Sequence, residues 1–402
     1  MRLSDRIKGL VASPIRRLIP YADEAKAKGK KVYHLNIGQP DIKTPDEYFE
    51  AIRNFKVDTI AYADSKGRTE MRDAISSYYK SWDINYERDD IYITNGGSEA
   101  LSFAINTICD AGDNVLVPEP FYANYNTFTK TALANIVPIP TKAEEGFHLP
   151  DKRVIENLIN SKTRAIWISN PGNPTGAVYT AKELEMLVDI AKRHDIYLIA
   201  DEVYREFTYD GERFTSLGHI DGALDRTIMI DSVSKRFSAC GARIGCIAIK
   251  NKEFMAQVLK LCQGRLSVST IEQVGAAALY NTPKSYLEAV NKEYKARRDI
   301  LYTELKKIDG LICEEPKGAF YIMAKLPIDD SEKFVIWMLE NFDINGETTM
   351  GAPGGGFYAT PGLGVNEMRL AYVLKCEDLV KAANILKQAI AAYPGRLEAI
   401  KA

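Results

Sequence analysis

Seven short and almost uninterrupted apolar segments recur between about residue 68 and residue 250. Helix-like segments such as residues 98–111 and 181–195 lie between them. Strands with so few polar residues are typical of a parallel or mostly parallel sheet that is covered on both faces. This alternation predicts a doubly wound α/β domain. The expected strands are residues 90–94, 114–118, 135–140, 164–169, 196–200, 227–231 and 244–249.

The pattern changes after about residue 283, where a long, highly charged helix is expected at residues 284–308. A strand at 318–326, a helix, a Gly/Pro-rich loop at 351–364, a second strand and a final helix follow, which together predict a smaller α+β domain. Residues 32–45 are expected to join this part or to bridge the two. We therefore interpret residues 46–283 as a large α/β domain, and residues 1–45 with 284–402 as a small domain.

Composition places the chain among ordinary globular proteins. Its 402 residues are 46% apolar and 26% charged, and the formal net charge is −2. At about 150 residues per domain, this length favours two or three domains. The near-neutral charge gives no reason to expect nucleic acid or an anionic membrane as a partner. No apolar run approaches the roughly 18 residues of a membrane helix, and the N-terminus lacks a signal-peptide core, so we expect a cytoplasmic protein.

The reactive residue types show no familiar metal or hydrolase pattern. The six cysteines form no CxxC pair and the four histidines are widely separated, so we expect a reducing compartment and no metal site. Spacing alone does not exclude a Ser-His-Asp triad, but there is no GxSxG motif. No triphosphate-binding GxxxxGK[ST] motif occurs, and no GxGxxG opens a βα unit.

Polar residues follow the ends of several predicted strands, where doubly wound sheets bind ligands. In "NGGSEAL", two glycines and Ser98 open a helix, with Ser98 as the expected N-cap. The free N–H groups of such a helix end favour an anion, commonly a phosphate, although an ordinary capped loop would look the same. Tyr122 in "EPFYANY" offers a ring either for a flat cofactor or for core packing.

The next strand ends add an amide, an acid, a phenol and two cations. Taken singly, each has a plain structural explanation as a loop, a core ion pair or a basic surface segment. Together they suit a flat, phosphorylated, heteroaromatic aldehyde, because lysine forms an imine with an aldehyde and a carboxylate keeps a ring nitrogen protonated. The residues are Asn173 in "SNPGNPTGAVY", Asp201 and Tyr204 in "DEVY", and Ser232, Lys235 and Arg243 in "SVSKRFSACGARIG".

The order and spacing of "NPGNPTG", "DEVY" and "SVSKRFSACGARIG" resemble the class I/II aminotransferases, pyridoxal-phosphate enzymes of fold type I, over essentially the whole chain. The resemblance implies that Lys235 holds the cofactor covalently and then moves a proton, and that Asp201 pairs with the pyridine nitrogen. It implies that Tyr204 and Asn173 bind the ring hydroxyl oxygen, and that Tyr122 stacks on the ring, a position often occupied by Trp in relatives.

The same resemblance implies contacts to the phosphate and to the substrate. It assigns the α-carboxylate of the substrate to Arg369 in "NEMRLAY" and to the backbone of Gly38 in "NIGQPD", and it implies a homodimer with active sites at the interface. A guanidinium suits the bidentate grip on a carboxylate better than an ammonium does. The phosphate is assigned to Gly97, Ser98, Ser232 and Arg243, with Tyr62 reaching the phosphate of the neighbouring subunit.

The implied reaction is ping-pong transamination between an amino acid and a 2-oxo acid. Arg265 stands four residues before Ser269. In one subgroup of aspartate aminotransferases, an arginine with this spacing to a serine comes from the partner subunit and binds the side-chain carboxylate of the substrate. The resemblance therefore favours aspartate or glutamate as the substrate type. An aromatic or branched-chain aminotransferase and a C–S lyase of the same fold remain alternatives. The glycines of "GAPGGGFY" fit either a loop that lines the substrate pocket or a flexible connector.

Overall fold

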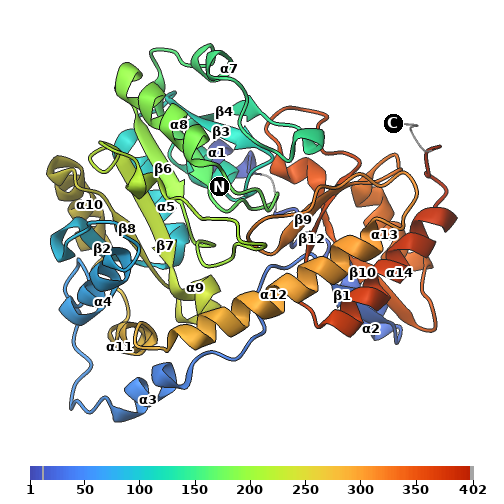
Figure 1. The fold of residues 1–402 in the computed structure, drawn as a ribbon, viewed down its shortest axis with the longest axis horizontal. Coiled ribbons are helices and arrows are strands. Elements are labelled where there is room, and N and C mark those ends of the chain that lie inside the picture. Colours follow the sequence, from blue (N-terminus) through green and yellow to red (C-terminus); the bar gives the residue numbers. More distant parts are fainter. Residues whose placement is uncertain (11–12, 399–402) are drawn as a thin grey trace.

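A seven-stranded sheet forms the centre of one half of the protein (Figure 1). The structure, a computed structural model, describes residues 1–10 and 13–398. The strand order is β2-β8-β7-β6-β5-β3-β4, and only β8 runs antiparallel to its neighbours. Each of the seven predicted strands is confirmed to within one residue at either end. The strands are β2 (Ile91–Asn95), β3 (Asn114–Glu119), β4 (Asn135–Pro140), β5 (Thr163–Ser169), β6 (Tyr197–Asp201), β7 (Thr227–Ser232) and β8 (Ile244–Ala248).

Helices cover both faces of this sheet, which confirms the doubly wound prediction. Successive residues of a strand point to opposite faces. Accordingly, Ile199 packs in the apolar core on one face, with Trp167, whereas Leu198 packs in the core on the other face. The first face carries α5 (Gly96–Ile108), α6 (Tyr125–Thr131) and α10 (Lys252–Arg265), and the second carries α4 (Thr69–Lys80), α8 (Ala181–His194) and α11 (Thr270–Leu279), with α3 (Asp46–Asn54) on α11.

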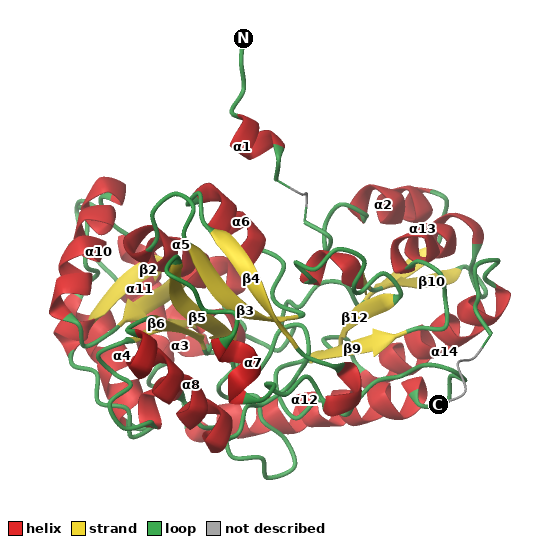
Figure 2. Cartoon of the chain, turned by 90° about the horizontal axis from the view of Figure 1, so that it is seen from above, coloured by secondary structure: helices red, strands yellow, loops and turns green. Residues whose placement is uncertain are grey.

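The other half contains two smaller sheets built from both ends of the chain. Strand β1 (Lys31–His34) pairs in parallel with β10 (Glu347–Met350), so the N-terminal stretch joins the C-terminal part as expected. The second sheet is antiparallel, in the order β11 (Ala352–Pro353), β12 (Glu367–Ala371) and β9 (Tyr321–Lys325). Around them lie α2 (Ile19–Ala27), α13 (Ser331–Asn341) and α14 (Cys376–Ala392), while α12 (Lys284–Leu305) runs along both halves (Figures 1 and 2).

The start of α5 differs from the expectation. The helix begins at Gly96, its N-cap residue is Asn95, and Ser98 lies inside the first turn, so the prediction of Ser98 as the N-cap is wrong. The reason is that Glu99 reaches back and accepts hydrogen bonds from the backbone N–H of Asn95 at 2.8 Å and from its Nδ2 at 3.2 Å. The N-cap of the helix therefore lies three residues closer to the strand than predicted.

The Gly/Pro-rich loop is attached to the large sheet. Its residues Gly354–Phe357 form a 3₁₀ turn. The buried carboxylate of Glu119, the last residue of β3, accepts hydrogen bonds from the Ala359 N–H at 3.0 Å and the Thr360 N–H at 3.1 Å. The N–H of Phe121 also donates to the Phe357 carbonyl oxygen at 2.9 Å. These bonds hold the loop against the carboxyl end of β3.

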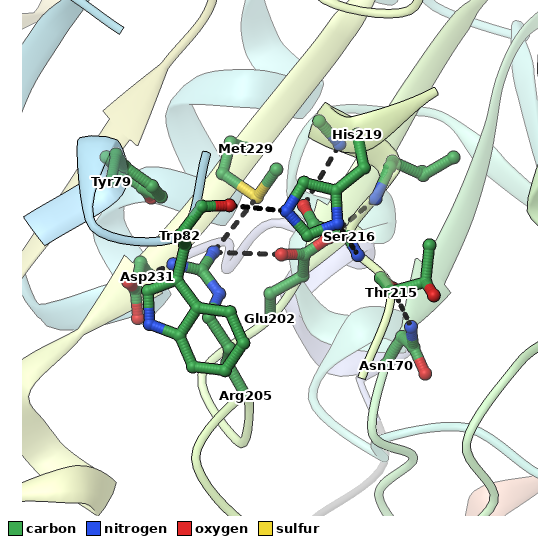
Figure 3. Close-up of polar contacts among 12 residues, drawn as sticks. Tyr79, Trp82, Asn170, Glu202, Arg205, Thr215, Ser216, His219, Met229 and Asp231 are labelled. Atoms are coloured by element: carbon green, nitrogen blue, oxygen red, sulfur yellow. Dashed lines mark hydrogen bonds and ion pairs between the residues drawn. The ribbon is translucent and has the colours of Figure 1, made fainter. Parts of the chain in front are cut away.

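A buried, charge-balanced ion cluster lies beside the carboxyl ends of β6 and β7, and Figure 3 shows three of its members, Glu202, Arg205 and Asp231. It consists of Glu202, Arg205, Asp231 and Arg236, whose side chains are at most 2% exposed. Arg236 donates to both carboxylate oxygens of Asp231 at 2.5 and 2.6 Å, and Arg205 donates to Glu202 at 2.8 Å. Glu202 also accepts from the Ser216 hydroxyl at 2.9 Å, which ties β6 to the loop that follows it.

None of the helices in the described ranges is long and apolar enough to cross a membrane.

We predict that Arg236→Met lowers the free energy of unfolding by about 3–5 kcal/mol, because it leaves the buried Asp231 carboxylate without its closest cation. The exposed pair of Arg88 with Asp73 is a matched control, since loss of a surface ion pair costs about 0–1 kcal/mol. Urea unfolding of the two Arg→Met variants measures the difference. Equal urea midpoints for Arg236→Met and Arg88→Met would contradict the stabilising role of the cluster.

Candidate active site

Asp201 closes β6 with a buried carboxylate that lacks an ionic partner. One oxygen, Oδ2, accepts a hydrogen bond from the Tyr125 hydroxyl at 2.8 Å, while Oδ1 has no partner in the described chain. Burial raises the pKa of Asp201 to about 6, and the hydrogen bond from Tyr125 acts in the opposite direction. A buried polar atom without a hydrogen bond is unfavourable, so Oδ1 is suited to receive an N–H or O–H group of a ligand.

Arg369 on β12 is the second buried charge without a counter-charge. It is 1% exposed, and no carboxylate of the described residues lies within ion-pair distance. Its Nη1 donates to Asn173 Oδ1 at 3.0 Å and its Nη2 to the Asn36 carbonyl oxygen at 2.7 Å, while Nε has no partner. Burial lowers the pKa of Arg369, which shows the cost of holding this cation in the interior. An incoming carboxylate would compensate that cost.

Lys235 lies between these two charges in sequence, on the short helix α9 (Val233–Arg236). Its Nζ donates to the Gly38 carbonyl oxygen at 2.9 Å, and its ammonium is 5.9 Å from the centre of the Tyr204 ring. A Cβ atom on Gly38 would lie 1.9 Å from the hydroxyl oxygen of Tyr321, so only glycine allows this approach. The hydroxyl groups of Tyr321 and Tyr204 are 2.8 Å apart. The lysine amine, the Gly38 backbone and two phenols thus meet in one place.

The first turn of α5 faces a cation. Arg243 has a left-handed backbone, with φ of 53°, and its Nη1 and Nη2 donate to the carbonyl oxygens of Cys240 at 3.0 Å and Asn95 at 3.4 Å. A Cβ atom on Gly96 would lie 2.4 Å from Nη2 of Arg243, so the guanidinium lies directly against the helix end. Gly97 and Ser98 follow in that first turn, whose N–H groups have no acceptor within the helix. A cation beside free N–H groups is an arrangement suited to a phosphate.

Ser232, the N-cap of α9, lies at the end of β7 on the opposite sheet face from Asp231. Its Oγ accepts a hydrogen bond from the Ser234 N–H at 3.1 Å and lies 2.9 Å from the Ile244 carbonyl oxygen. The residue therefore stabilises the turn that carries Lys235.

Tyr122 packs against Tyr125, the residue that donates a hydrogen bond to Asp201. Its ring meets the Tyr125 ring edge-on with centroids 5.6 Å apart, and its hydroxyl oxygen accepts from Asn124 Nδ2 at 2.8 Å. Tyr125, the first residue of α6, lies three residues further on and could not be selected from the sequence. Tyr321 and Phe357 were also missed, and they contact the Arg369 guanidinium with ring centroids 4.5 and 5.0 Å away. The only signal for these two residues in the sequence is that each is an aromatic residue in or beside a buried strand.

Two of the predicted site residues, Tyr62 and Arg265, are not brought to the cluster of Asp201, Lys235 and Arg369 within their own chain. Tyr62 is 80% exposed and lies between α3 and α4, in a segment without helix or strand. Arg265 donates through Nη2 to the carbonyl oxygens of Ser65 at 3.1 Å and Ile93 at 3.3 Å, and its Nη1 lies 3.6 Å from Glu99. Both residues were assigned to the active site of a neighbouring subunit, and those roles stay predictions.

Comparison with known proteins identifies the family. The family model described as aminotransferase class I and II matches residues 30–348, and the chain belongs to this family. The chain is 30% identical over 398 residues to an aspartate aminotransferase of Bacillus subtilis (strain 168), covering 96% of this chain and 98% of the relative.

Solved structures agree with the family assignment. Aspartate aminotransferase from Thermus thermophilus with maleate has a TM-score of 0.86 and 30% identity, covering 97% of this chain and 100% of that one. An alanine aminotransferase from Pyrococcus furiosus has a TM-score of 0.87 and 32% identity, covering 96% and 99%. The protein is accordingly an enzyme of pyridoxal-phosphate-dependent transamination, acting on amino and 2-oxo acids.

We predict that Asp201→Asn stabilises the cofactor-free protein above pH 6. Because the pKa of Asp201 is about 6 in the folded chain against an ordinary 3.8, the folded state binds more protons between these values, and its stability falls as the pH rises through this interval. The full loss is about 3 kcal/mol. Urea unfolding of both cofactor-free proteins at pH 4 and pH 7 measures it. Parallel pH profiles of wild type and variant would contradict the assigned pKa.

Proposed function

We propose that Lys235, Asp201 and Arg369 form the catalytic centre of this aminotransferase and that the chain binds pyridoxal 5′-phosphate there. The observation that carries the proposal is the pair of buried charges, Asp201 and Arg369, neither of which has an ionic partner in the described chain. Unpaired buried charges are costly, so they persist where a ligand completes them. A cofactor with a protonated ring nitrogen and a substrate with a carboxylate supply the two missing partners.

The residues fit this cofactor. Asp201 Oδ1 would accept the ring N–H, Tyr204 and Asn173 would bind the ring hydroxyl oxygen, and Tyr122 would pack against the ring. The phosphate would lie at the first turn of α5, with Gly97, Ser98, Ser232 and Arg243. When bound, the cofactor supplies an aldehyde that takes up the amino group and a ring that accepts an electron pair.

The protein's own groups then perform the proton transfer and hold the substrate. Arg369 would exchange its bonds to Asn173 and Asn36 for a two-point contact with the α-carboxylate, which orients Cα toward Lys235. Lys235 Nζ, which here donates a hydrogen bond to the Gly38 carbonyl oxygen, would act as a neutral amine when it removes the proton from Cα. Asp201 stays ionised beside the ring nitrogen and stabilises its positive charge.

We propose aspartate- or glutamate-type substrates. The names of several relatives, including the aspartate aminotransferases of Bacillus subtilis (strain 168) and Thermus thermophilus, support this class. The alanine aminotransferase among the structural relatives keeps a smaller substrate open. An aromatic or branched-chain aminotransferase, or a C–S lyase, is distinguished by its preferred donor or by release of pyruvate and ammonia without an acceptor.

We also propose a homodimer in which Tyr62 reaches the phosphate of the neighbouring subunit. We further propose that the chain has two domains, residues 46–283 and residues 1–45 with 284–402. The exposure of Tyr62 supports the homodimer. The division is supported by a hydrophobic core built mainly from residues 1–45 and 284–402, to which residues 46–283 add only Tyr204, Phe207 and Tyr209 as buried members. Six unpaired cysteines support a cytoplasmic, reducing environment.

We predict that Lys235→Ala abolishes transamination, with a loss in kcat on the order of 10²–10⁴ or more, because no other amine can move the Cα proton. Wild type mixed with pyridoxal phosphate should show a Lys235-linked absorption band that bleaches with L-aspartate and returns with 2-oxoglutarate. The variant should bind the cofactor without that band. If equilibrium dialysis showed that the wild type does not bind pyridoxal phosphate, the proposal would be refuted.

We predict that the chain sediments as a dimer and that Tyr62→Phe weakens cofactor affinity roughly 10- to 100-fold, as expected for one hydrogen bond to a charged group. Equilibrium dialysis of pyridoxal phosphate measures the affinity. Tyr21→Phe, a change in a tyrosine for which we propose no such role, serves as the control. A monomeric wild type with unchanged affinity in Tyr62→Phe would contradict the shared site.

A further inference from the structure

The segment 13–18 packs against residues that surround Arg369. The Ile15 carbonyl oxygen accepts a hydrogen bond from Asn36 Nδ2 at 2.9 Å, and the Asn36 carbonyl oxygen in turn accepts from Arg369. A Cβ atom on Gly356 would lie 2.4 Å from Pro14, so the segment packs directly against the Gly-rich loop. Ile15 also packs on the apolar cluster that contains Phe357, whose ring contacts Arg369. Through hydrogen bonds, Asn36 thus links this segment to Arg369, the proposed site of the α-carboxylate.

Arg16 occupies the centre of this segment and has no partner for its charge. It is exposed, and its guanidinium forms no ion pair or hydrogen bond with a described residue. The next residue, Arg17, differs because its guanidinium pairs with Glu332 on α13. Burial raises the pKa of Tyr122 to about 12, and Arg16 is one of the two arginines, with Arg369, that act against this rise.

Arg265, the other arginine considered for a side-chain carboxylate, is already engaged. Its Nη2 bonds two backbone carbonyl oxygens and its Nη1 faces Glu99, with the side chain only 13% exposed. Recruiting it to a substrate would break these contacts. Arg16 needs no such exchange, because a solvated guanidinium on a flexible stem can turn toward an arriving carboxylate.

We propose that Arg16 binds the side-chain carboxylate of a dicarboxylic amino acid or 2-oxo acid while Arg369 binds its α-carboxylate. This inference rests on the proposed function, since it requires the α-carboxylate to lie at Arg369. A guanidinium fork at each end of the substrate gives two charge-assisted contacts, and the apolar side chains of Ile15 and Phe357 limit the space between them.

The test compares Arg16→Leu with Arg17→Leu, which makes the same charge change one residue away, and with Arg265→Leu. The holoenzymes are assayed with L-aspartate and with L-alanine as amino donors. For Arg16→Leu we expect kcat/KM for L-aspartate to fall roughly 10- to 100-fold, as for loss of a hydrogen-bonded charge, with L-alanine unchanged within about twofold. Arg16→Lys should recover part of the loss, and Arg17→Leu should keep the wild-type ratio of the two donors.

A binding measurement separates recognition from turnover. Maleate, a dicarboxylate without an amino group, should bind wild type more tightly than propionate does, and Arg16→Leu should remove most of that difference. An equal loss for both donors, an unchanged ratio, or a selective loss in Arg265→Leu instead would each overturn the role of Arg16. A wild type that transaminates L-alanine but not L-aspartate would also overturn it. Failure of the proposed function is seen separately, as a wild type that transaminates no donor.

Discussion

Two opposite charges, Asp201 and Arg369, are buried without ionic partners, and the rest of the site is arranged around them. The residue after Asp201 shows the contrast. Glu202 points to the other face of the sheet, where Arg205 neutralises it within a cluster that also contains Asp231. Strand alternation thus separates a charge that the protein satisfies internally from one that it leaves for a ligand. The internal cluster anchors the strand ends, so the unsatisfied carboxylate is held at a defined position despite its cost.

The site exists only where the two halves of the chain meet. Asp201 and Lys235 come from the large sheet, whereas Arg369 comes from the small antiparallel sheet and is bonded to Asn36 from the N-terminal stretch. Glu119 fastens the Gly-rich loop to the end of β3, which places Phe357 against the Arg369 guanidinium. Cofactor chemistry and substrate recognition are therefore supplied by different parts of the fold, and their spacing depends on these few contacts between the halves.

The inner part of the site and its rim have different physical characters. The inner groups are buried and bonded to backbone or side-chain partners, so they suit chemistry shared by the whole family. Arg16 is exposed, lies in a segment packed on the loop, and has no partner for its charge among the described residues. Selectivity between donors that differ only in the side chain is most easily set at such a position, because a change there leaves the buried groups undisturbed.

The sequence by itself determined the seven strands of the large sheet, because strands buried on both faces are continuously apolar. Asp201, Asn173 and Lys235 could be selected because they lie at or shortly after the ends of three of these strands. The tertiary structure decided that Tyr125 bonds Asp201, that Glu99 moves the helix start away from Ser98, and that Arg265 is held by its own chain. These outcomes depend on side-chain directions and on contacts between segments far apart in the chain, which no local pattern encodes.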